Sequence, residues 1–233
     1  MEIQIGVAKI NKYASSESGD TLEVVERPNG GLSVVLADGQ RSGNSAKRIS
    51  NMVVRKVVSL LAEGVRDGPA ARAASDYLYS MRGGKVLSTL NILSIDLETF
   101  TLVISRNNPS PIYYIKNTKS KSLDEPSQPV GVYRNTKPII SELPLQSGLT
   151  VVAFTDGLVT AGQRKGTKLD IPGELISCTE QEFTAQQIAD HLIDLALNLD
   201  DHRPIDDISI VVLQVSHQRG DQVRRMSVLL PLK

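Results

Sequence analysis

Three segments with helical periodicity interrupt a chain that otherwise consists of short runs rich in Val, Ile and Leu. From Ala46 to Leu61 apolar residues recur every three or four positions, which predicts a long helix with one buried face. An Ala-rich segment, 70–80, and the pattern over 184–199 predict two more helices. The remaining apolar runs are too short for helices and predict strands at 3–10, 21–26, 32–37, 86–95, 101–106, 111–116, 138–143, 149–155, 207–215 and 224–230.

Strands and helices are grouped along the chain instead of alternating, and this order favours one fold class. Alternation would indicate a parallel sheet, whereas grouping indicates an α+β fold with antiparallel sheets. Each helix is apolar along one face only and needs a sheet to cover. We therefore expect an antiparallel β-sandwich flanked by α-helices, with the polar segment 117–129 as a surface loop.

Charge and cysteine content narrow the function classes. The 233 residues include 26 Lys and Arg against 26 Asp and Glu, so no large positive field favours nucleic acid. The single Cys excludes a disulfide framework or a cysteine zinc cluster within the chain. With no signal-peptide pattern and no long apolar run, the sequence predicts a cytoplasmic protein without a membrane partner. We interpret it as a single domain over 1–233, with 216–233 as a C-terminal extension.

Acidic residues stand at the ends of apolar strands. Asp20 precedes a strand, Asp38 and Asp156 each end one and are followed by glycine, and Asp206-Asp207 precedes the run 208–213. Carboxylates that converge at the rim of a sheet repel one another and need a cation. Oxygen ligands of this kind suit Mg²⁺ or Mn²⁺. A single Asp-Gly pair is more often only a turn, so the four positions together carry the prediction.

Sequence motifs around these acids appear in a recognisable order. They are Ser18-Gly19-Asp20, then Asp38-Gly39-Gln40-Arg41-Ser42-Gly43-Asn44-Ser45-Ala46, then Ser88-Thr89-Leu90, then Val152-Ala153-Phe154-Thr155-Asp156-Gly157, and finally Asp206-Asp207-Ile208-Ser209. Over nearly the whole chain they resemble the metal-dependent protein phosphatases of type 2C, and in particular the bacterial branch of stage II sporulation and stressosome phosphatases. The resemblance implies a four-layer αββα sandwich.

The resemblance also implies a site for two ions, Mn²⁺ or Mg²⁺. Asp38 would bridge the ions and Gly39 would offer its carbonyl oxygen. Asp20 would serve one ion and Asp156 the other. Asp206 would join Asp156, with Asp207 as the adjacent alternative. Asp38 and Asp156 would then be catalytic through metal-bound water.

By the same resemblance, the chain would be a serine/threonine phosphatase. Its substrate would be a phosphorylated regulatory protein, such as an anti-sigma-factor antagonist or a stressosome protein. Two alternatives stay open: a non-catalytic pseudophosphatase that binds a signalling partner, and a hydrolase of small phosphate esters. A cysteine phosphatase fits worse, because Thr184 stands six residues after Cys178, where that chemistry requires Arg.

The chain departs from the family around the expected phosphate. No arginine precedes Asp20, where the eukaryotic branch places a phosphate-binding one, and Lys9 and Lys12 are the nearest bases. Arg41 is a candidate substrate contact, with an exposed arginine at a helix start as the other interpretation. Segment 157–183 lies where the family carries a variable substrate-facing flap, and a solvated loop is an equal alternative.

Overall fold

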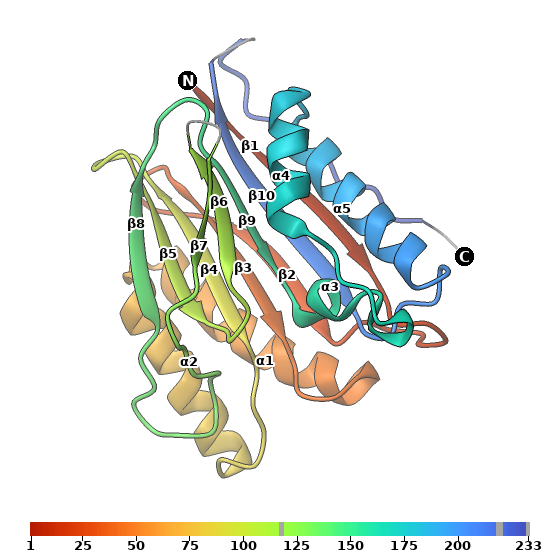
Figure 1. Cartoon of the computed structure of the whole chain (residues 1–233). Coiled ribbons are helices and arrows are strands. Elements are labelled where there is room, and N and C mark those ends of the chain that lie inside the picture. Colours follow the sequence, from red (N-terminus) through yellow and green to blue (C-terminus); the bar gives the residue numbers. More distant parts are fainter. Residues whose placement is uncertain (117–118, 218–220, 232–233) are drawn as a thin grey trace.

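Two five-stranded sheets face each other between two layers of helices (Figure 1). The computed structural model describes residues 1–116, 119–217 and 221–231. One sheet has the strand order β1-β10-β9-β6-β7 and the other β2-β3-β4-β5-β8, and all neighbouring strands run antiparallel. The expected α+β sandwich of four layers is confirmed.

The first sheet consists of β1 (Glu2–Ile10), β6 (Ile112–Lys116), β7 (Lys119–Leu123), β9 (Thr150–Phe154) and β10 (Ile208–Ser216). The second consists of β2 (Asp20–Glu26), β3 (Leu32–Asp38), β4 (Leu90–Asp96), β5 (Thr101–Asn107) and β8 (Ile139–Pro144). The helices are α1 (Gly43–Ala62), α2 (Asp67–Arg82), the short α3 (Asp156–Thr160), α4 (Ile171–Glu180) and α5 (Ala185–Leu199), with a 3₁₀ turn, η1, at Gln163–Lys165.

The period of two along β3 explains how one strand supports two cores. Val34 and Leu36 pack between the sheets, against residues such as Val211 of β10. Val35 and Ala37 point the other way and pack under α1 and α2. Successive side chains of a strand face opposite sides of the sheet, so an uninterrupted apolar run is needed where both faces are covered. On the outer face of the first sheet, α4 and α5 cover a third core.

Three local expectations are wrong. The predicted loop 117–129 contains the strand β7, which pairs with β6; residues 117 and 118 lie outside the described part of the chain. Segment 224–230 is not a strand and is exposed along its length. Segment 157–183 is not a solvated loop throughout, because α4 buries Leu175 and Cys178 against the first sheet and α5.

No helix within the described residues is long and apolar enough to cross a membrane.

Candidate metal centre

Strand ends bring the acidic residues to one edge of the sandwich. Asp20 begins β2 and lies opposite Asp38, the last residue of β3, in the register of the two strands. Asp156 follows β9 and begins α3, while Asp206 stands two residues before β10. Because β9 and β10 are antiparallel neighbours, the end of one lies beside the start of the other. Four positions spread over most of the chain therefore meet at one edge.

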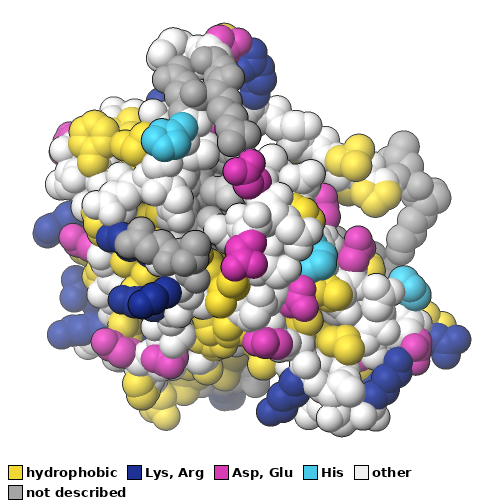
Figure 2. Space-filling model, turned by 45° about the horizontal axis from the view of Figure 1, so that its top comes forward, with side chains coloured by type: hydrophobic (Ala, Val, Ile, Leu, Met, Phe, Trp, Pro, Cys, Tyr) yellow, Lys and Arg dark blue, Asp and Glu magenta, His cyan; other side chains and the backbone are white. Residues whose placement is uncertain are grey.

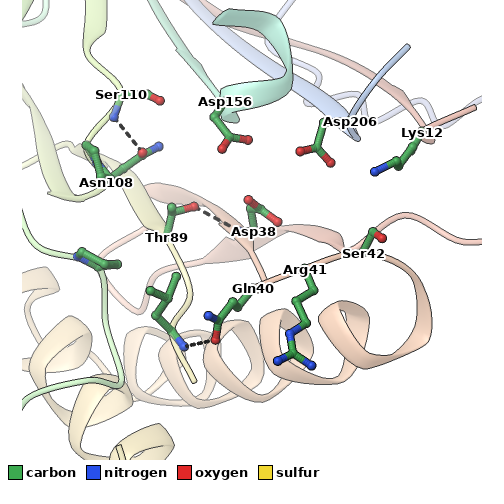
Figure 3. Close-up of a pocket in the computed structure, with 13 residues that line it drawn as sticks. Lys12, Asp38, Gln40, Arg41, Ser42, Thr89, Asn108, Ser110, Asp156 and Asp206 are labelled. Carbon is green, nitrogen blue, oxygen red and sulfur yellow. Dashed lines mark hydrogen bonds between the residues drawn. The ribbon is translucent and has the colours of Figure 1, made fainter. Parts of the chain in front are cut away.

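A hollow of about 440 Å³ lies at this edge, and Asp38, Asp156 and Asp206 line it together with Lys12 and Asn108. In Figure 3 the carboxyl groups of Asp156 and Asp206 face Asp38 from the opposite side of the hollow. The site thus joins groups from the ends of both sheets.

The pKa of Asp38 is raised to about 9, first by burial and then by the negative charges of Asp20, Asp156 and Asp206. Burial also raises the pKa of Asp156, with the charge of Asp206 adding to it. These carboxyl groups cannot all ionise at low cost without a positive charge between them. In the absence of a cation, Asp38 holds a proton at neutral pH.

Asp20 is not among the residues that line the hollow and is fully buried. Its Oδ2 accepts hydrogen bonds from Ser209 Oγ (2.6 Å) and Thr155 Oγ1 (3.0 Å). Its Oδ1 is buried and has no hydrogen-bond partner among the described residues. Burial raises the pKa of Asp20 to about 6. An unpartnered carboxylate oxygen at this depth is the kind of atom that a cation would satisfy.

Two lysines hold the backbone at Asp20. Lys9 Nζ and Lys47 Nζ each donate to the Asp20 carbonyl oxygen at 2.6 Å. Burial and the nearby Lys47 lower the pKa of Lys9 to about 8. Both lysines contact the carbonyl oxygen and leave the Asp20 carboxylate to Ser209 and Thr155.

Asp206 and Asp207 have different surroundings although they are adjacent. Asp207 is buried, and its two oxygens accept hydrogen bonds from the backbone N–H groups of Lys12 (2.8 Å) and Gly19 (2.7 Å). It therefore ties the N-terminal loop to the start of β10. Asp206 lines the hollow instead.

The glycines after Asp38 and Asp156 have a packing reason of their own. A Cβ on Gly39 would lie 2.0 Å from the carbonyl oxygen of Ala46 in α1, and one on Gly157 would lie 2.1 Å from the carbonyl oxygen of Asp207. Neither backbone group could accommodate such an approach without moving. The Asp-Gly pattern thus reflects close backbone packing around the site as well as its acids.

Asn108 and Ser110 line the hollow without a signal in the sequence, beside Thr89, Lys12 and Arg41, which already stand out there. Thr89 Oγ1 accepts from the Asp38 N–H (3.3 Å), and Asn108 Oδ1 accepts from the Ser110 N–H (2.9 Å), which fixes two parts of the wall. Lys12 lies near Asp206 (Figure 3). Arg41 also lines the hollow, but its guanidinium points away from Asp38 towards α1.

The donor set fits hard divalent cations in its chemistry. It offers carboxylate oxygens, mutual repulsion that a cation would relieve, and the unpartnered Oδ1 of Asp20. The carboxyl groups are not drawn into a closed cage: within the described residues, no group of three or more His, Cys, Asp or Glu side chains is positioned to hold a metal ion. Binding would therefore require side chains such as Asp156 and Asp206 to rotate inward.

Curated relatives align with most of this chain but are much longer. Stage II sporulation protein E from Priestia megaterium is 20% identical over 220 residues, which are 92% of this chain and 37% of the relative. The protein of the same name from Bacillus subtilis (strain 168) is 19% identical over 227 residues, 92% of this chain and 26% of the relative. The chain thus spans little more than a third of the first relative and about a quarter of the second.

Solved structures share the fold at low identity. The PP2C phosphatase domain of SpoIIE from Bacillus subtilis, with a fragment of its regulatory domain, matches with a TM-score of 0.77 at 19% identity, over 92% of this chain and 64% of that one. The RsbU and RsbW domains of a Mycobacterium tuberculosis protein match at 0.77 and 15%, over 94% and 62%. The catalytic domain of the serine/threonine phosphatase PstP with two manganese ions matches at 0.70 and 15%, over 92% and 99%.

A family model gives the assignment. The model described as Stage II sporulation protein E (SpoIIE) matches residues 28–216, which include Asp38, Asp156 and Asp206. The match covers well over half of the chain and runs from the β2–β3 turn to the end of β10. This chain therefore belongs to the SpoIIE family, whose solved member has the PP2C phosphatase fold.

Proposed function

We propose that this chain is a metal-dependent serine/threonine protein phosphatase that hydrolyses phosphoserine or phosphothreonine on a regulatory protein. One observation carries the proposal: Asp38, Asp156 and Asp206 line a single hollow, and burial, together with the charges of Asp20, Asp156 and Asp206, raises the pKa of Asp38 to about 9. A cluster of this kind is costly for a fold and is common where a protein must hold cations. Membership of the SpoIIE family supports the same reading.

The carboxylates would hold two divalent ions, Mn²⁺ or Mg²⁺. We assign Asp38 as the bridge, with the Gly39 carbonyl beside it. We assign Asp20 to one ion, and Asp156 with Asp206 to the other. Asp207 is excluded from the ligand set by this proposal, because both of its oxygens already accept backbone hydrogen bonds. The PstP domain, which shares the fold, contains two manganese ions in its solved structure.

In the proposed reaction the aspartates hold the metal ions and do not act as nucleophiles. Bound divalent ions supply positive charge to the phosphate dianion and acidify the attacking water. Asp38 would bind the ions as a carboxylate, because a neighbouring positive charge would offset the burial and the negative charges that raise its pKa. Lys12 would add positive charge to the hollow, since this sequence lacks the phosphate-binding arginine that the eukaryotic branch of the type 2C phosphatases places before its first acidic motif.

The substrate class follows from the family. We propose a phosphoprotein of a partner-switching or stressosome pathway, such as an anti-sigma-factor antagonist. The fold match to a chain that contains RsbU and RsbW domains supports this class. We also propose that the chain is a single phosphatase domain over 1–233, with 216–233 as a C-terminal extension.

The test is Mn²⁺-dependent hydrolysis of p-nitrophenyl phosphate and of a phosphoserine peptide by the purified chain. We expect turnover that needs Mn²⁺ or Mg²⁺ and is abolished by a chelator. A small-ester hydrolase would instead process metabolite phosphates in preference to phosphopeptides, so a panel of both substrates separates the two readings. No turnover with either metal would contradict the proposal.

A second candidate, a pseudophosphatase that binds a signalling partner without catalysis, is favoured by one observation. No closed metal cage exists among the described acidic, His and Cys side chains. A pseudophosphatase would show neither metal-dependent turnover nor stabilisation by Mn²⁺. Thermal melts with and without Mn²⁺ therefore distinguish the candidates independently of the substrate chosen.

A further inference from the structure

A second hollow, of about 340 Å³, lies between the first turns of α1 and the end of α2. Its lining residues are Asn44, Ser45, Arg48, Ile49, Arg82 and Val86. We call it the basic pocket, because its charged lining residues are two arginines and no acid. Its volume is sufficient for one or two amino-acid side chains from another molecule.

The basic pocket adjoins the hollow that holds the aspartates. Arg41 and Ser42 line the first hollow, while Asn44 and Ser45 line the second. The same division recurs on the other wall, where Leu87 faces the first hollow and Val86 the second. Neighbouring residues at the start of α1 and before β4 therefore form a boundary between the two hollows, which we call the Gln40–Leu87 wall.

That wall is held by hydrogen bonds. The Gln40 N–H donates to the Leu87 carbonyl oxygen (3.0 Å), and the Leu87 N–H donates to Gln40 Oε1 (3.3 Å). These hydrogen bonds join the segment that follows Asp38 to the segment that precedes β4, and residues of both segments continue into the lining of the basic pocket.

The charge of this region differs from that of the whole chain. The chain has a formal net charge of zero, yet α1 contains four basic residues and no acidic one. Arg48 and Arg82 are exposed. Within the described residues neither takes part in an ion pair. Their guanidinium groups are free to bind a carboxylate from outside, for which the planar fork of arginine is suited.

We propose that the basic pocket binds an acidic side chain, Asp or Glu, that lies a few residues from the phosphorylated residue of the protein substrate. This inference rests on the proposed phosphatase function and adds a determinant of sequence specificity. The aspartate hollow recognises a phosphate group that every substrate shares. The basic pocket would bind side chains on either side of the phosphorylated residue, because an extended peptide seated in the first hollow can reach across the Gln40–Leu87 wall.

The test uses two fluorescein-labelled phosphoserine peptides that differ only in having Glu or Gln at the positions flanking the phosphoserine on both sides. With Mn²⁺ present, we expect kcat/KM to be about fivefold higher for the Glu peptide at low ionic strength. The double variant Arg48→Gln/Arg82→Gln should lose this ratio. Arg55→Gln, which changes an exposed arginine of α1 outside the pocket, should keep it. The ratio between peptides divides out any general change in turnover.

Two further measurements keep the result clear. The charge-reversed variant Arg48→Glu/Arg82→Glu should prefer a Lys-flanked peptide, and the wild-type preference should shrink as salt rises, since exposed charge pairs are screened. Equal kcat/KM for the Glu and Gln peptides, or a preference that survives in Arg48→Gln/Arg82→Gln, would overturn the proposal.

The failure of the phosphatase function can be told apart from the failure of the pocket. If the wild type hydrolyses neither peptide, the proposed function is wrong. Fluorescence anisotropy of the same two peptides then tests the pocket without turnover. Tighter binding of the Glu peptide, lost in Arg48→Gln/Arg82→Gln, would support the pocket, and equal affinities would overturn it.

Discussion

Asp38 and Asp96 look alike in the sequence and behave in opposite ways in the structure. Each is the last residue of an apolar strand, β3 and β4, and these strands are antiparallel neighbours. The two residues therefore lie at opposite ends of the sandwich. Asp96 accepts hydrogen bonds from the backbone N–H groups of Glu98 (2.8 Å) and Thr99 (3.1 Å), and the bond from Thr99 is the main reason its pKa is lowered.

The difference between the two ends shows what makes a strand-end aspartate functional. At the Asp96 end the turn supplies donors, so the carboxylate is satisfied by its own neighbours in sequence. At the Asp38 end, burial and the charges of the neighbouring carboxyl groups raise the pKa of Asp38 to about 9. A carboxylate that the fold leaves unsatisfied needs a ligand from outside.

The substitution with the largest expected effect on activity is Asp38→Asn. The substitution keeps the shape and removes the charge that would bridge two ions. We expect Mn²⁺-dependent kcat/KM to fall at least about 100-fold, since even changes to residues behind a metal ligand cost 10- to 100-fold. Steady-state hydrolysis of p-nitrophenyl phosphate measures the effect, and unchanged turnover in Asp38→Asn would refute the site.

Asp206 and Asp207 offer a matched pair within two adjacent residues. Asp207→Ala removes the acceptor of two backbone hydrogen bonds, one buried and one partly buried, and should cost about 2–4 kcal/mol of unfolding free energy. Asp206→Ala removes the acceptor of a single partly buried hydrogen bond, from the Asp207 N–H (2.9 Å), so it should cost only about 0.5–1.5 kcal/mol and should remove stabilisation by Mn²⁺. Urea unfolding with and without Mn²⁺ reports both quantities, and the reverse pattern would assign the ligand to Asp207.

The sequence predicted the helices and strands whose apolar residues recur at a regular spacing. The run 32–37 reads as a doubly covered strand because Val34 and Leu36 face one core while Val35 and Ala37 face another. It did not predict β7, because Lys119–Leu123 is polar and becomes a strand only by pairing with β6. It missed α4, whose buried side chains are spaced over fewer than three turns.

The sequence located the acidic cluster but could not apportion it. Adjacent residues such as Asp206 and Asp207 have the same local pattern, and only the position of the Lys12 and Gly19 N–H groups separates them. The sequence offered Lys9 and Lys12 as the bases nearest to Asp20, but it did not predict Asn108 as a site residue, since tertiary structure alone brings it to the hollow. The apolar run 224–230 shows the opposite error, because hydrophobicity without a partner strand does not make a strand.

The raised pKa of Asp38 makes a prediction about the ion-free protein. A carboxyl group whose pKa is higher in the folded state stabilises the fold fully below its ordinary pKa of 3.8, and this stability is lost as pH rises towards about 9. The melting temperature of the chelated wild type should therefore fall by at least about 2–4 °C between pH 6 and pH 8, the shift that 1 kcal/mol produces in a domain of this size. Asp38→Asn should show a flatter profile.

The window from pH 6 to pH 8 is chosen to isolate Asp38. The pKa of Asp20 is raised only to about 6, so its contribution has mostly passed, and the lowered pKa of Lys9, about 8, acts with the opposite sign at higher pH. Saturating Mn²⁺ should remove the slope in the wild type by compensating the charge. An equal slope in Asp38→Asn and wild type would show that other groups carry the pH dependence.

The smallest expected effect is at the other end of the sandwich. Asp96→Ala removes an acceptor at a turn where water can replace it, so it should cost only about 0.5–1 kcal/mol. Metal-dependent turnover should stay unchanged, because Asp96 contributes its carboxylate to the Glu98 and Thr99 N–H groups and not to the hollow. Thermal melts and p-nitrophenyl phosphate hydrolysis on the same preparation measure both. A loss of turnover in Asp96→Ala would show that strand-end acids support activity through stability of the fold, and the distinction between the two ends would no longer explain the site.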